Sequence, residues 1–147
     1  MTKITVTAFI FHDDRLLLVF HKKLQRWMHV GGHVEENELF DEALKREIKE
    51  EVGLNVEIID AHSLGISYNR KLATPIFVQG NEKSGKKDIS IDYVCKVIGT
   101  SSVRLQSEEL EDYKWVSMPE LESINTFPLL KQLAKEAFKM YRFSQKM

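Results

Sequence analysis

The chain has 147 residues, of which 43% are hydrophobic and 29% are charged, and its formal net charge is −1. This length and composition are typical of one globular domain with a sizeable core, so we expect a single domain over residues 1–147. The near-neutral charge excludes a basic face for duplex nucleic acid and a polybasic anchor for a membrane.

The N-terminus and the cysteine content indicate the cellular compartment. Residues 1–15 lack an apolar segment long enough for a signal peptide, and no run approaches the roughly 18 apolar residues of a membrane span. A single cysteine, Cys95, excludes an internal disulfide. We therefore expect a cytoplasmic protein in which Cys95 is a small core residue rather than a nucleophile.

A β-hairpin is predicted at the start of the chain. Residues 4–11 are rich in β-branched and aromatic side chains, Asp13 and Asp14 favour a turn, and residues 15–20 return as a second strand. Both runs are almost continuously apolar. We therefore expect both faces of this part of the sheet to be covered.

The segment from residue 21 to residue 28 is a basic loop with an aromatic end. Such a segment is typical of a solvated surface, but it lies immediately before a pair of glycines. An equally strong interpretation is a substrate loop, in which Lys22 or Arg26 contacts a polyphosphate and Trp27 stacks on a base.

An amphipathic helix is predicted from about residue 38 to residue 52, with Gly53 as its C-terminal cap. Its apolar sector contains Leu39, Phe40, Ala43, Leu44, Ile48 and Val52. Lys45 and Lys49 point to the opposite side, toward water.

Three glutamates, Glu47, Glu50 and Glu51, project toward the edge of that apolar sector. Carboxylates at these spacings repel each other, and they lie near the negative end of the helix dipole. Folding alone gains nothing from this arrangement, whereas a hard divalent cation such as Mg²⁺ removes the conflict. Arg46 supplies one compensating positive charge.

Further strands are predicted over residues 55–60, 62–68, 89–98 and 113–116. Residues 69–88 contain Pro75, Gly80 and Gly85 together with several lysines. This composition indicates a short strand near residues 76–78 within an exposed, mobile loop. Its lysines are typical of a solvated surface, and a lid over an anionic substrate is the alternative.

A second amphipathic helix ends the chain. Ser117 and Pro119 open a brief helical turn, and Thr126 as N-cap with Pro128 in the first turn marks the start of the helix. Apolar side chains then recur with helical spacing at Leu129, Leu130, Leu133, Ala134, Ala137, Phe138 and Tyr141. This order of elements predicts an α/β fold with a mixed β-sheet between helical layers.

The stretch GGHVEENELFDEALKREIKEEVGL, residues 31–54, resembles the signature of the Nudix hydrolase family of MutT-like enzymes, G-x5-E-x7-R-E-U-x-E-E-x-G-U, where U is a bulky aliphatic residue. Its nine specified positions are filled by Gly32, Glu38, Arg46, Glu47, Ile48, Glu50, Glu51, Gly53 and Leu54. Val30 replaces the proline that precedes the glycine pair in many relatives. The resemblance implies an α/β/α sandwich with a mixed β-sheet, and the alternative is a solvated, Glu-rich surface helix.

The resemblance also implies a divalent metal site, with Mg²⁺ as the expected cation and Mn²⁺ as its substitute. Glu50 and Glu51 are implied as principal ligands and Glu47 as a ligand or base. The backbone carbonyl of Gly31 is implied as a further ligand, and Arg46 is implied to orient the glutamates.

Two more carboxylates are assigned by the same resemblance. Glu38 is implied as a mainly structural residue that pairs with Arg46. Family members often add a carboxylate from a loop ahead of the late strand. In this chain Glu109 is our choice for that catalytic role, and Glu108 and Glu111 are its rivals.

The implied reaction is attack by water on a phosphoanhydride of a nucleoside diphosphate that is linked to another group. The small size, the short hairpin and Trp27 favour a nucleoside triphosphate pyrophosphohydrolase. Hydrolases of ADP-ribose or of dinucleoside polyphosphates, a hydrolase of RNA 5′ ends and a non-catalytic nucleotide-binding module remain as alternatives. The expected partner is a small nucleotide, without duplex nucleic acid or membrane, and a homodimer stays open.

Overall fold

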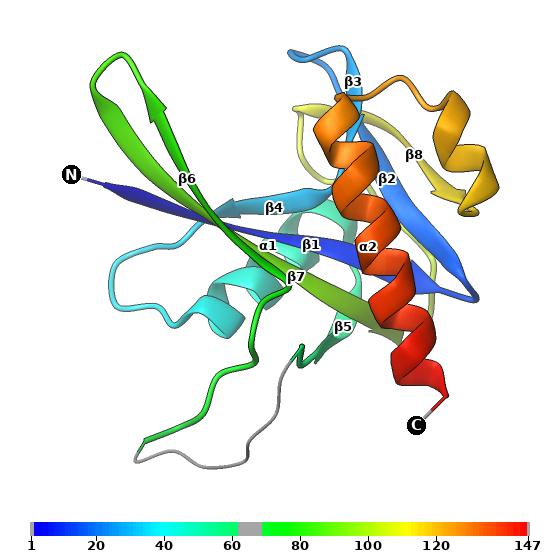
Figure 1. The fold of residues 1–147 in the computed structure, drawn as a ribbon, viewed down its shortest axis with the longest axis horizontal. Coiled ribbons are helices and arrows are strands. Elements are labelled where there is room, and N and C mark those ends of the chain that lie inside the picture. The colour runs from blue at the N-terminus through cyan, green and yellow to red at the C-terminus, as the bar shows by residue number, and fades with distance from the viewer. Residues whose placement is uncertain (1, 62–68, 147) are drawn as a thin grey trace.

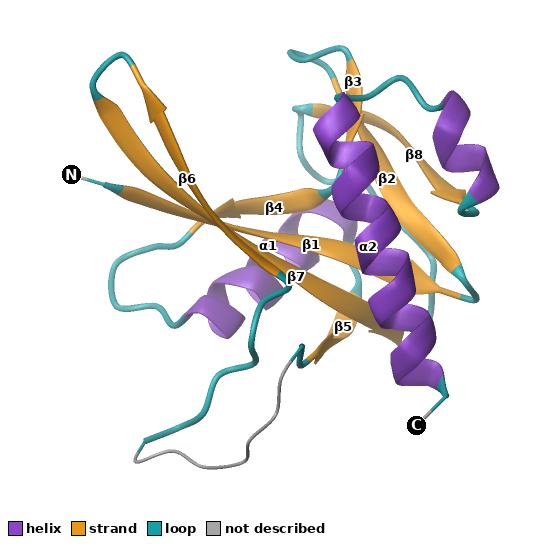
Figure 2. Ribbon diagram, viewed as in Figure 1, coloured by secondary structure: helices purple, strands orange, loops and turns teal. Residues whose placement is uncertain are grey.

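A computed structural model describes residues 2–61 and 69–146, in which a mixed β-sheet is flanked by helices (Figures 1 and 2). The elements, in chain order, are β1 (Lys3–His12), β2 (Arg15–His21), β3 (Arg26–Met28), β4 (Val30–His33), α1 (Phe40–Val52), β5 (Asn55–Ile59), β6 (Phe77–Lys83), β7 (Lys86–Ile98), β8 (Leu110–Val116), the 3₁₀ helix η1 (Pro119–Ser123) and α2 (Pro128–Gln145).

Strand β1 is at the centre of the sheet. It pairs antiparallel with β2 and β4 and parallel with β7. The sheet runs in the order β3-β2-β1-β7-β5, with β4 beside β1, β6 beside β7 and β8 beside β2. The predicted turn between β1 and β2 is confirmed, since Asp13 and Asp14 adopt φ angles of 48° and 59°, as a two-residue hairpin turn requires.

The two faces of the sheet carry separate cores. On one face, helix α1 buries Ala43, Leu44, Ile48 and Val52 against the side chains of Val6, Ala8 and Ile10. On the other, helix α2 buries Leu130, Ala134, Ala137 and Phe138 against Phe9, Phe11 and Leu18. The alternation of side chains along β1 therefore serves both layers, and the predicted α/β/α sandwich is confirmed.

Helix α2 covers only part of its face of the sheet. The paired ends of β6 and β7 project away from it, beside the N-terminal end of β1 (Figure 1). Cross-strand partners share a face, and here Thr5 lies opposite both His33 and Ser90, while Ser90 lies opposite Gln79. This half of the face therefore carries polar side chains where the other half carries the α2 core.

Both helices begin later than the sequence predicts. Helix α1 starts at Phe40 because Leu39 is extended and serves as N-cap, which leaves Glu38 in the preceding loop. Helix α2 starts at Pro128 with Phe127 as N-cap. The prediction of Thr126 as N-cap was wrong, because its hydroxyl donates instead to the carbonyl of Trp27, at 2.5 Å. The predicted cap at Gly53 is confirmed, with φ of 73°.

The predicted loop over residues 69–88 is largely a hairpin. Strand β6 extends to Lys83, and β7 begins at Lys86. Ser84 and Gly85, with φ angles of 51° and 77°, form the turn between them. Similarly, the end of the predicted basic loop is strand β3, paired with β2. The extended segment predicted over residues 62–68 lies outside the described residues.

Two further expectations concern the role of Cys95 and the presence of a membrane span. Cys95 is fully buried in the core, and burial raises the pKa of its thiol, as expected for a structural residue. Among the described residues, no helix is long and apolar enough to cross a membrane.

Candidate active site

The two glycines of β4, Gly31 and Gly32, each allow another group to come close: the backbone of β1 in the case of Gly31 and the side chain of Glu47 in the case of Gly32. A Cβ atom on Gly32 would lie 2.2 Å from Cδ of Glu47, so the absence of a side chain leaves room for that carboxylate. A Cβ on Gly31 would lie 2.2 Å from the carbonyl oxygen of Val6 and would disturb the pairing of β4 with β1. The missing side chain of Gly32 therefore leaves the space that Glu47 occupies, and the missing side chain of Gly31 allows β4 to pair closely with β1.

Arg46 connects the candidate metal ligands to the loop ahead of α1. Its Nε and Nη2 atoms donate to the two oxygens of Glu38, at 2.6 and 2.9 Å. Its Nη1 donates to Glu47 at 2.9 Å and to Glu50 at 3.3 Å. Nη2 also donates to the carbonyl of His33, at 3.0 Å. The expected pairing of Glu38 with Arg46 is confirmed, and the guanidinium fixes several groups at once.

The electrostatics of Glu38 agree with this bridging role. The hydrogen bond from Arg46, together with one from the backbone N–H of Glu35, lowers the pKa of Glu38 to about 2. Glu38 is therefore ionised at any physiological pH. It acts as a fixed anchor for Arg46 rather than as a proton carrier.

The pKa of Glu51 is displaced in the opposite direction from that of Glu38. Burial raises its pKa, the charges of Glu47, Glu109 and Glu50 raise it further, and the backbone of Gly31 lowers it, with a net pKa of about 7. The fold therefore brings together Glu47, Glu50 and Glu51, which we call the box glutamates, and the predicted loop residue Glu109. These groups destabilise one another when all are ionised, which is the situation that a bound cation relieves.

Glu109 approaches the box glutamates from the loop before β8. Its carbonyl accepts a hydrogen bond from the N–H of Lys22 at 2.9 Å, and its carboxylate lies 3.7 Å from Nε2 of His21. The rivals Glu108 and Glu111 do not contribute to the pKa shift of Glu51. Position therefore favours Glu109 among the three loop carboxylates.

The predicted substrate residues occupy different places. Lys22 lies beside Glu109 through its backbone. The guanidinium of Arg26 lies 5.8 Å from the ring centre of Phe127. The ring of Trp27 already contacts the ammonium of Lys114, at 4.2 Å from its centre, and packs edge-on against Phe20. The structure therefore does not bring Arg26 and Trp27 to the glutamates, and one face of the indole is already in use.

A second polar cluster, which the sequence analysis missed, is centred on Asp92. This residue is only 1% exposed. It accepts hydrogen bonds from the Thr7 hydroxyl and from Nε2 of Gln79, at 2.7 Å for the latter, and Nε2 of His29 lies 3.3 Å away. Burial alone would raise the pKa of Asp92, but these partners outweigh it and hold the pKa below its usual value.

This cluster forms part of the wall of a hollow of about 240 Å³. The hollow is lined by Thr7, Met28, His29, Gln79, Ser90, Asp92, Phe127, Leu129, Leu130 and Leu133. Nδ1 of His29 is buried and, within the described chain, has no hydrogen-bond partner. An aspartate between the apolar residues Ile91 and Tyr93 of β7 was the sequence signal for this site. A buried charge in that setting is unusual unless polar partners surround it.

The glutamate cluster has the chemistry of a hard-cation site, although it is not a closed cage. In the described part of the chain, no three His, Cys, Asp or Glu side chains converge as metal ligands. Arg46 holds Glu47 and Glu50, while Glu51 is half-buried near Gly31. All the available donors are oxygen atoms, which suits Mg²⁺ or Mn²⁺ rather than a soft metal.

Comparison with known proteins identifies the family. A profile of the NUDIX domain matches residues 1–143, which is nearly the whole chain. The chain belongs to the NUDIX family. It is therefore a NUDIX hydrolase, a member of a family of pyrophosphohydrolases that typically use a divalent metal and bind small nucleotides. No curated protein in the comparison matches it.

Solved structures share the fold of this NUDIX hydrolase. A NUDIX-family hydrolase from Clostridium perfringens is 29% identical, with a TM-score of 0.82 and coverage of 94% of this chain and 97% of that one. The MutT protein of Methanosarcina mazei Go1 is 24% identical, with a TM-score of 0.69 and coverage of 96% and 95%. A C. elegans Ap4A hydrolase is 20% identical, with a TM-score of 0.73 and coverage of 97% and 99%.

Proposed function

We propose that this NUDIX hydrolase cleaves a phosphoanhydride bond of a nucleoside di- or triphosphate, free or linked to another group, with Mg²⁺ or Mn²⁺ as cofactor. The observation that carries the proposal is the set of carboxylates around Glu51. Burial and three like charges raise the pKa of Glu51 to about 7, and folding alone does not explain this concentration of negative charge.

The residues that would hold the cation are Glu47, Glu50, Glu51 and the carbonyl of Gly31. When bound, the cation supplies charge neutralisation for the phosphates and lowers the pKa of a water molecule. Arg46 is the positioning residue, because it contacts both Glu47 and Glu50 and is itself anchored by Glu38. Glu109 is our candidate for the general base, since its charge acts on Glu51 from a separate loop.

The reaction is a hydrolysis with a simple atom balance. Oxygen from water forms a bond to one phosphorus atom, and the bond from that phosphorus to the bridging oxygen breaks. The proton from water passes to the base, and the bridging oxygen leaves with the second phosphate. The products are two phosphate-bearing fragments, one of which retains the nucleoside.

We propose the hollow beside Asp92 as the binding site for the nucleoside. Its apolar side chains Leu129, Leu130 and Leu133 offer a surface for a planar ring. Its polar wall offers hydrogen-bond partners of fixed direction, because Asp92 is held by three neighbours. The hollow and the glutamates meet near the start of β4, since His29 in the wall of the hollow is two residues before Gly31, whose backbone forms a hydrogen bond with Glu51.

A panel of nucleotides with Mg²⁺ tests the proposal. We expect hydrolysis of at least one nucleoside di- or triphosphate derivative, loss of activity in excess chelator and recovery with Mg²⁺ or Mn²⁺. Chromatographic separation of phosphate, pyrophosphate and nucleoside monophosphate identifies the bond that breaks. Reaction in ¹⁸O-labelled water then identifies the phosphorus atom attacked.

A non-catalytic nucleotide-binding module is the competing function. The full set of box glutamates with Glu109 argues against it, because binding alone does not require several mutually repelling carboxylates. Binding of a nucleotide without turnover in any metal, by a protein that is folded by circular dichroism, would favour the module and reject hydrolysis.

A further inference from the structure

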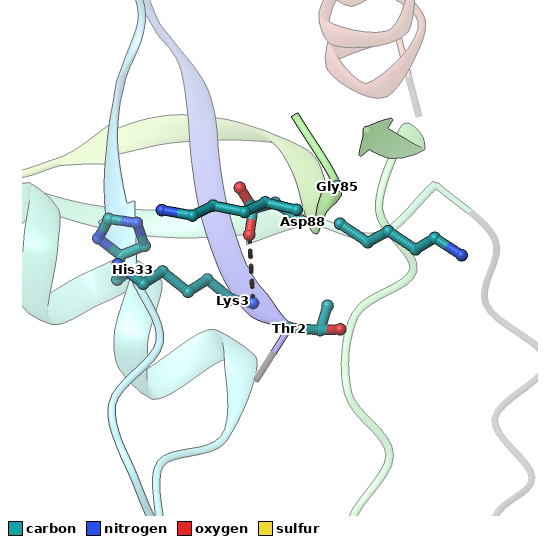
Figure 3. Close-up of a pocket in the computed structure, with 7 residues that line it drawn as sticks. Thr2, Lys3, His33, Gly85 and Asp88 are labelled. Atoms are coloured by element: carbon teal, nitrogen blue, oxygen red, sulfur yellow. Dashed lines mark hydrogen bonds between the residues drawn. The ribbon is translucent and has the colours of Figure 1, made fainter. Parts of the chain in front are cut away.

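One group of charged side chains outside the glutamate and Asp92 clusters borders a hollow of about 660 Å³, between the N-terminal end of β1 and the β6–β7 turn (Figure 3). At one side of this hollow the backbone N–H of Lys3 donates to the carboxylate of Asp88, at 3.3 Å. Lys87 of β7 lies opposite Glu82 of β6. Lys3 and Lys87 therefore each have a carboxylate as a near neighbour, as is usual on a solvated surface.

A second group is centred on Glu109, and the loop that carries this residue is attached to the last turn of α1. The backbone N–H of Gln106 donates to the carbonyl of Glu51 at 3.0 Å, and that of Arg104 donates to the carbonyl of Val52 at 2.9 Å. Carbonyls in the last turn of a helix lack partners further along the helix, and the loop supplies donors for these two. The start of the loop is therefore fixed relative to the turn that carries Glu51.

The end of the same loop is attached to β2 and to the segment that follows it. The carbonyl of Glu109 accepts a hydrogen bond from the N–H of Lys22 at 2.9 Å, and Leu110 lies opposite His21 in the register of β8 with β2. Within the loop, the N–H of Glu109 donates to the hydroxyl of Ser107 at 3.2 Å. Both backbone polar groups of Glu109 therefore have partners, and the place from which its side chain starts is fixed.

The imidazole of His21 is held with one nitrogen toward the Glu109 carboxylate. Its Nδ1 accepts a hydrogen bond from the backbone N–H of Leu24, at 3.4 Å, and its Nε2 lies 3.7 Å from Oε2 of Glu109. An imidazole nitrogen that accepts a hydrogen bond carries no proton. The proton of the neutral ring therefore lies on Nε2, on the side of the carboxylate.

The two side chains of this pair differ in how firmly they are held. The side chain of His21 is 23% exposed, whereas that of Glu109 is 73% exposed. The charges of Glu109 and Glu51 oppose each other, as the raised pKa of Glu51 shows. An exposed carboxylate with this repulsion turns toward solvent unless a donor holds it, and the N–H of His21 is such a donor. A rotation of the Glu109 side chain shortens 3.7 Å to hydrogen-bond length, and catalytic hydrogen bonds commonly tighten in this way when substrate binds.

We propose that His21 is a positioning residue for the general base. Its Nε2–H donates to one oxygen of Glu109 and leaves the other oxygen to accept the proton from water. The imidazole keeps its own proton throughout, so it acts through Glu109 and not on the reacting atoms. This inference rests on the proposed function, in which Glu109 takes the proton.

A pair of substitutions separates the N–H donor from the bulk of the imidazole. His21→Leu removes the donor, whereas the side-chain amide of His21→Gln places an N–H near the position of Nε2. On the best substrate of the nucleotide panel, we expect kcat of His21→Leu to fall about tenfold with KM within about twofold, as for a base that is held less well. His21→Gln should recover most of kcat. His12→Leu, at the end of the neighbouring strand β1, is the control and should keep full activity.

A double-mutant cycle tests whether His21 acts through Glu109. In a Glu109→Gln background there is no base to position, so His21→Leu should cause no further loss of kcat. A purely structural role would give the same loss in both backgrounds. Equal losses in the two backgrounds, or a His21→Gln enzyme no better than His21→Leu, would overturn the inference. Circular dichroism and urea unfolding of each variant check that the fold is retained.

The tautomer of His21 provides a measurement that does not depend on turnover. Long-range ¹H–¹⁵N NMR spectra of the metal-free protein at about pH 8, above the ordinary range of imidazole titration, should show the proton on Nε2. The ring nitrogen shifts should change in Glu109→Gln and not in Glu108→Gln. A proton on Nδ1, or ring shifts that Glu109→Gln leaves unchanged, would refute the contact.

The two measurements distinguish failure of this inference from failure of the proposed function. Nucleotide hydrolysis with equal losses in the two backgrounds, or with the wrong tautomer, would refute the role of His21 and leave the proposed function standing. A protein that hydrolyses no nucleotide would reject the proposed function and with it the catalytic role of His21. In that case the NMR spectra still decide whether His21 holds the Glu109 carboxylate.

Discussion

Glu109 acts electrostatically on Glu51 although the two residues belong to different parts of the chain, one to the loop before β8 and the other to the last turn of α1. Its charge is the second-largest carboxylate contribution to the raised pKa of Glu51, after that of Glu47. Arg46 contacts Glu47 and Glu50, whereas the neighbour of the Glu109 carboxylate is His21, at 3.7 Å, so we propose the loop carboxylate as the group that accepts the proton from water.

Glu109→Gln should lower kcat by about 10²- to 10⁴-fold, the usual contribution of general base catalysis, with little change in KM. The side chain is exposed, so the fold should be retained. Turnover at saturating Mg²⁺ is the measurement. Glu108→Gln and Glu111→Gln are the matched controls. An unchanged kcat for Glu109→Gln would remove this residue from the mechanism.

Glu51→Gln should nearly abolish hydrolysis and also change how stability depends on pH in metal-free protein. The folded pKa of about 7 lies above the ordinary value of 4.5. The folded state therefore binds more protons between these pH values, so wild-type stability should fall as pH rises from about 4.5 to 7. A glutamine cannot ionise, so the variant should lack this decline.

The expected size of that decline is about 1–2 kcal/mol, because a pKa unit corresponds to about 1.4 kcal/mol and partial exposure reduces the effect. Urea unfolding in chelator at pH 5 and pH 7.5 measures it. With Mg²⁺ the wild type should regain stability at pH 7.5, and Glu51→Gln should not. Parallel pH dependences for the two metal-free proteins would contradict the origin we give for the raised pKa.

Gly32→Ala should separate the position of Glu47 from its chemistry. The new methyl group would lie 2.2 Å from Cδ of Glu47, well inside van der Waals contact, so the carboxylate must leave the position in which Arg46 holds it. We expect a loss of about 1–3 kcal/mol in stability from this overpacking and a larger loss in kcat than in KM. Urea unfolding and steady-state kinetics measure the two effects.

Gly80→Ala is the matched control for this substitution, since Gly80 also lies in a strand but has nothing within 4 Å of its would-be Cβ. It should leave kcat unchanged. If Gly32→Ala keeps full activity, the space over Gly32 does not determine the place of Glu47.

The sequence predicted those parts of the fold that depend on local patterns. The spacing of apolar residues identified both helices, and the Asp13–Asp14 turn identified the first hairpin. The β6–β7 hairpin was missed because its polar strand ends resemble a loop and their pairing depends on the distant register of β7 with β1. The helix starts were missed because Glu38 and Thr126 use their side chains for contacts outside their own helices.

The candidate site was predictable to the extent that it is contiguous in sequence. The box glutamates and Arg46 lie on one helix, so their spacing alone indicated a cluster. Asp92 and Gln79 come from two strands, His29 lies between β3 and β4, and the three meet only through the sheet register. Trp27 seemed free to stack on a base because its contacts with Lys114 and Phe20 are set by the fold, not by neighbours in sequence.

Asp92→Asn should alter recognition of the nucleoside more than the chemical step. The ionised carboxylate accepts from Thr7 and Gln79 and lies beside His29, whereas an amide would present a donor to one of these donors. We expect KM to rise about tenfold, kcat to change little and the preference among bases to shift. The measurement is kcat/KM for the adenine, guanine, cytosine and uracil forms of the best substrate.

Stability provides a second measurement on the same variant. Since the pKa of Asp92 is held below its usual value, its charge stabilises the fold above the ordinary aspartate range, and this contribution disappears as the pH falls through the lowered pKa. Asp92→Asn should therefore be destabilised most at neutral pH and least in acid. Asp88→Asn, in the same strand, should show neither the change in base preference nor this pH dependence. An Asp92→Asn enzyme with equal losses on all four bases would indicate a purely structural role for the carboxylate and would place the nucleoside elsewhere.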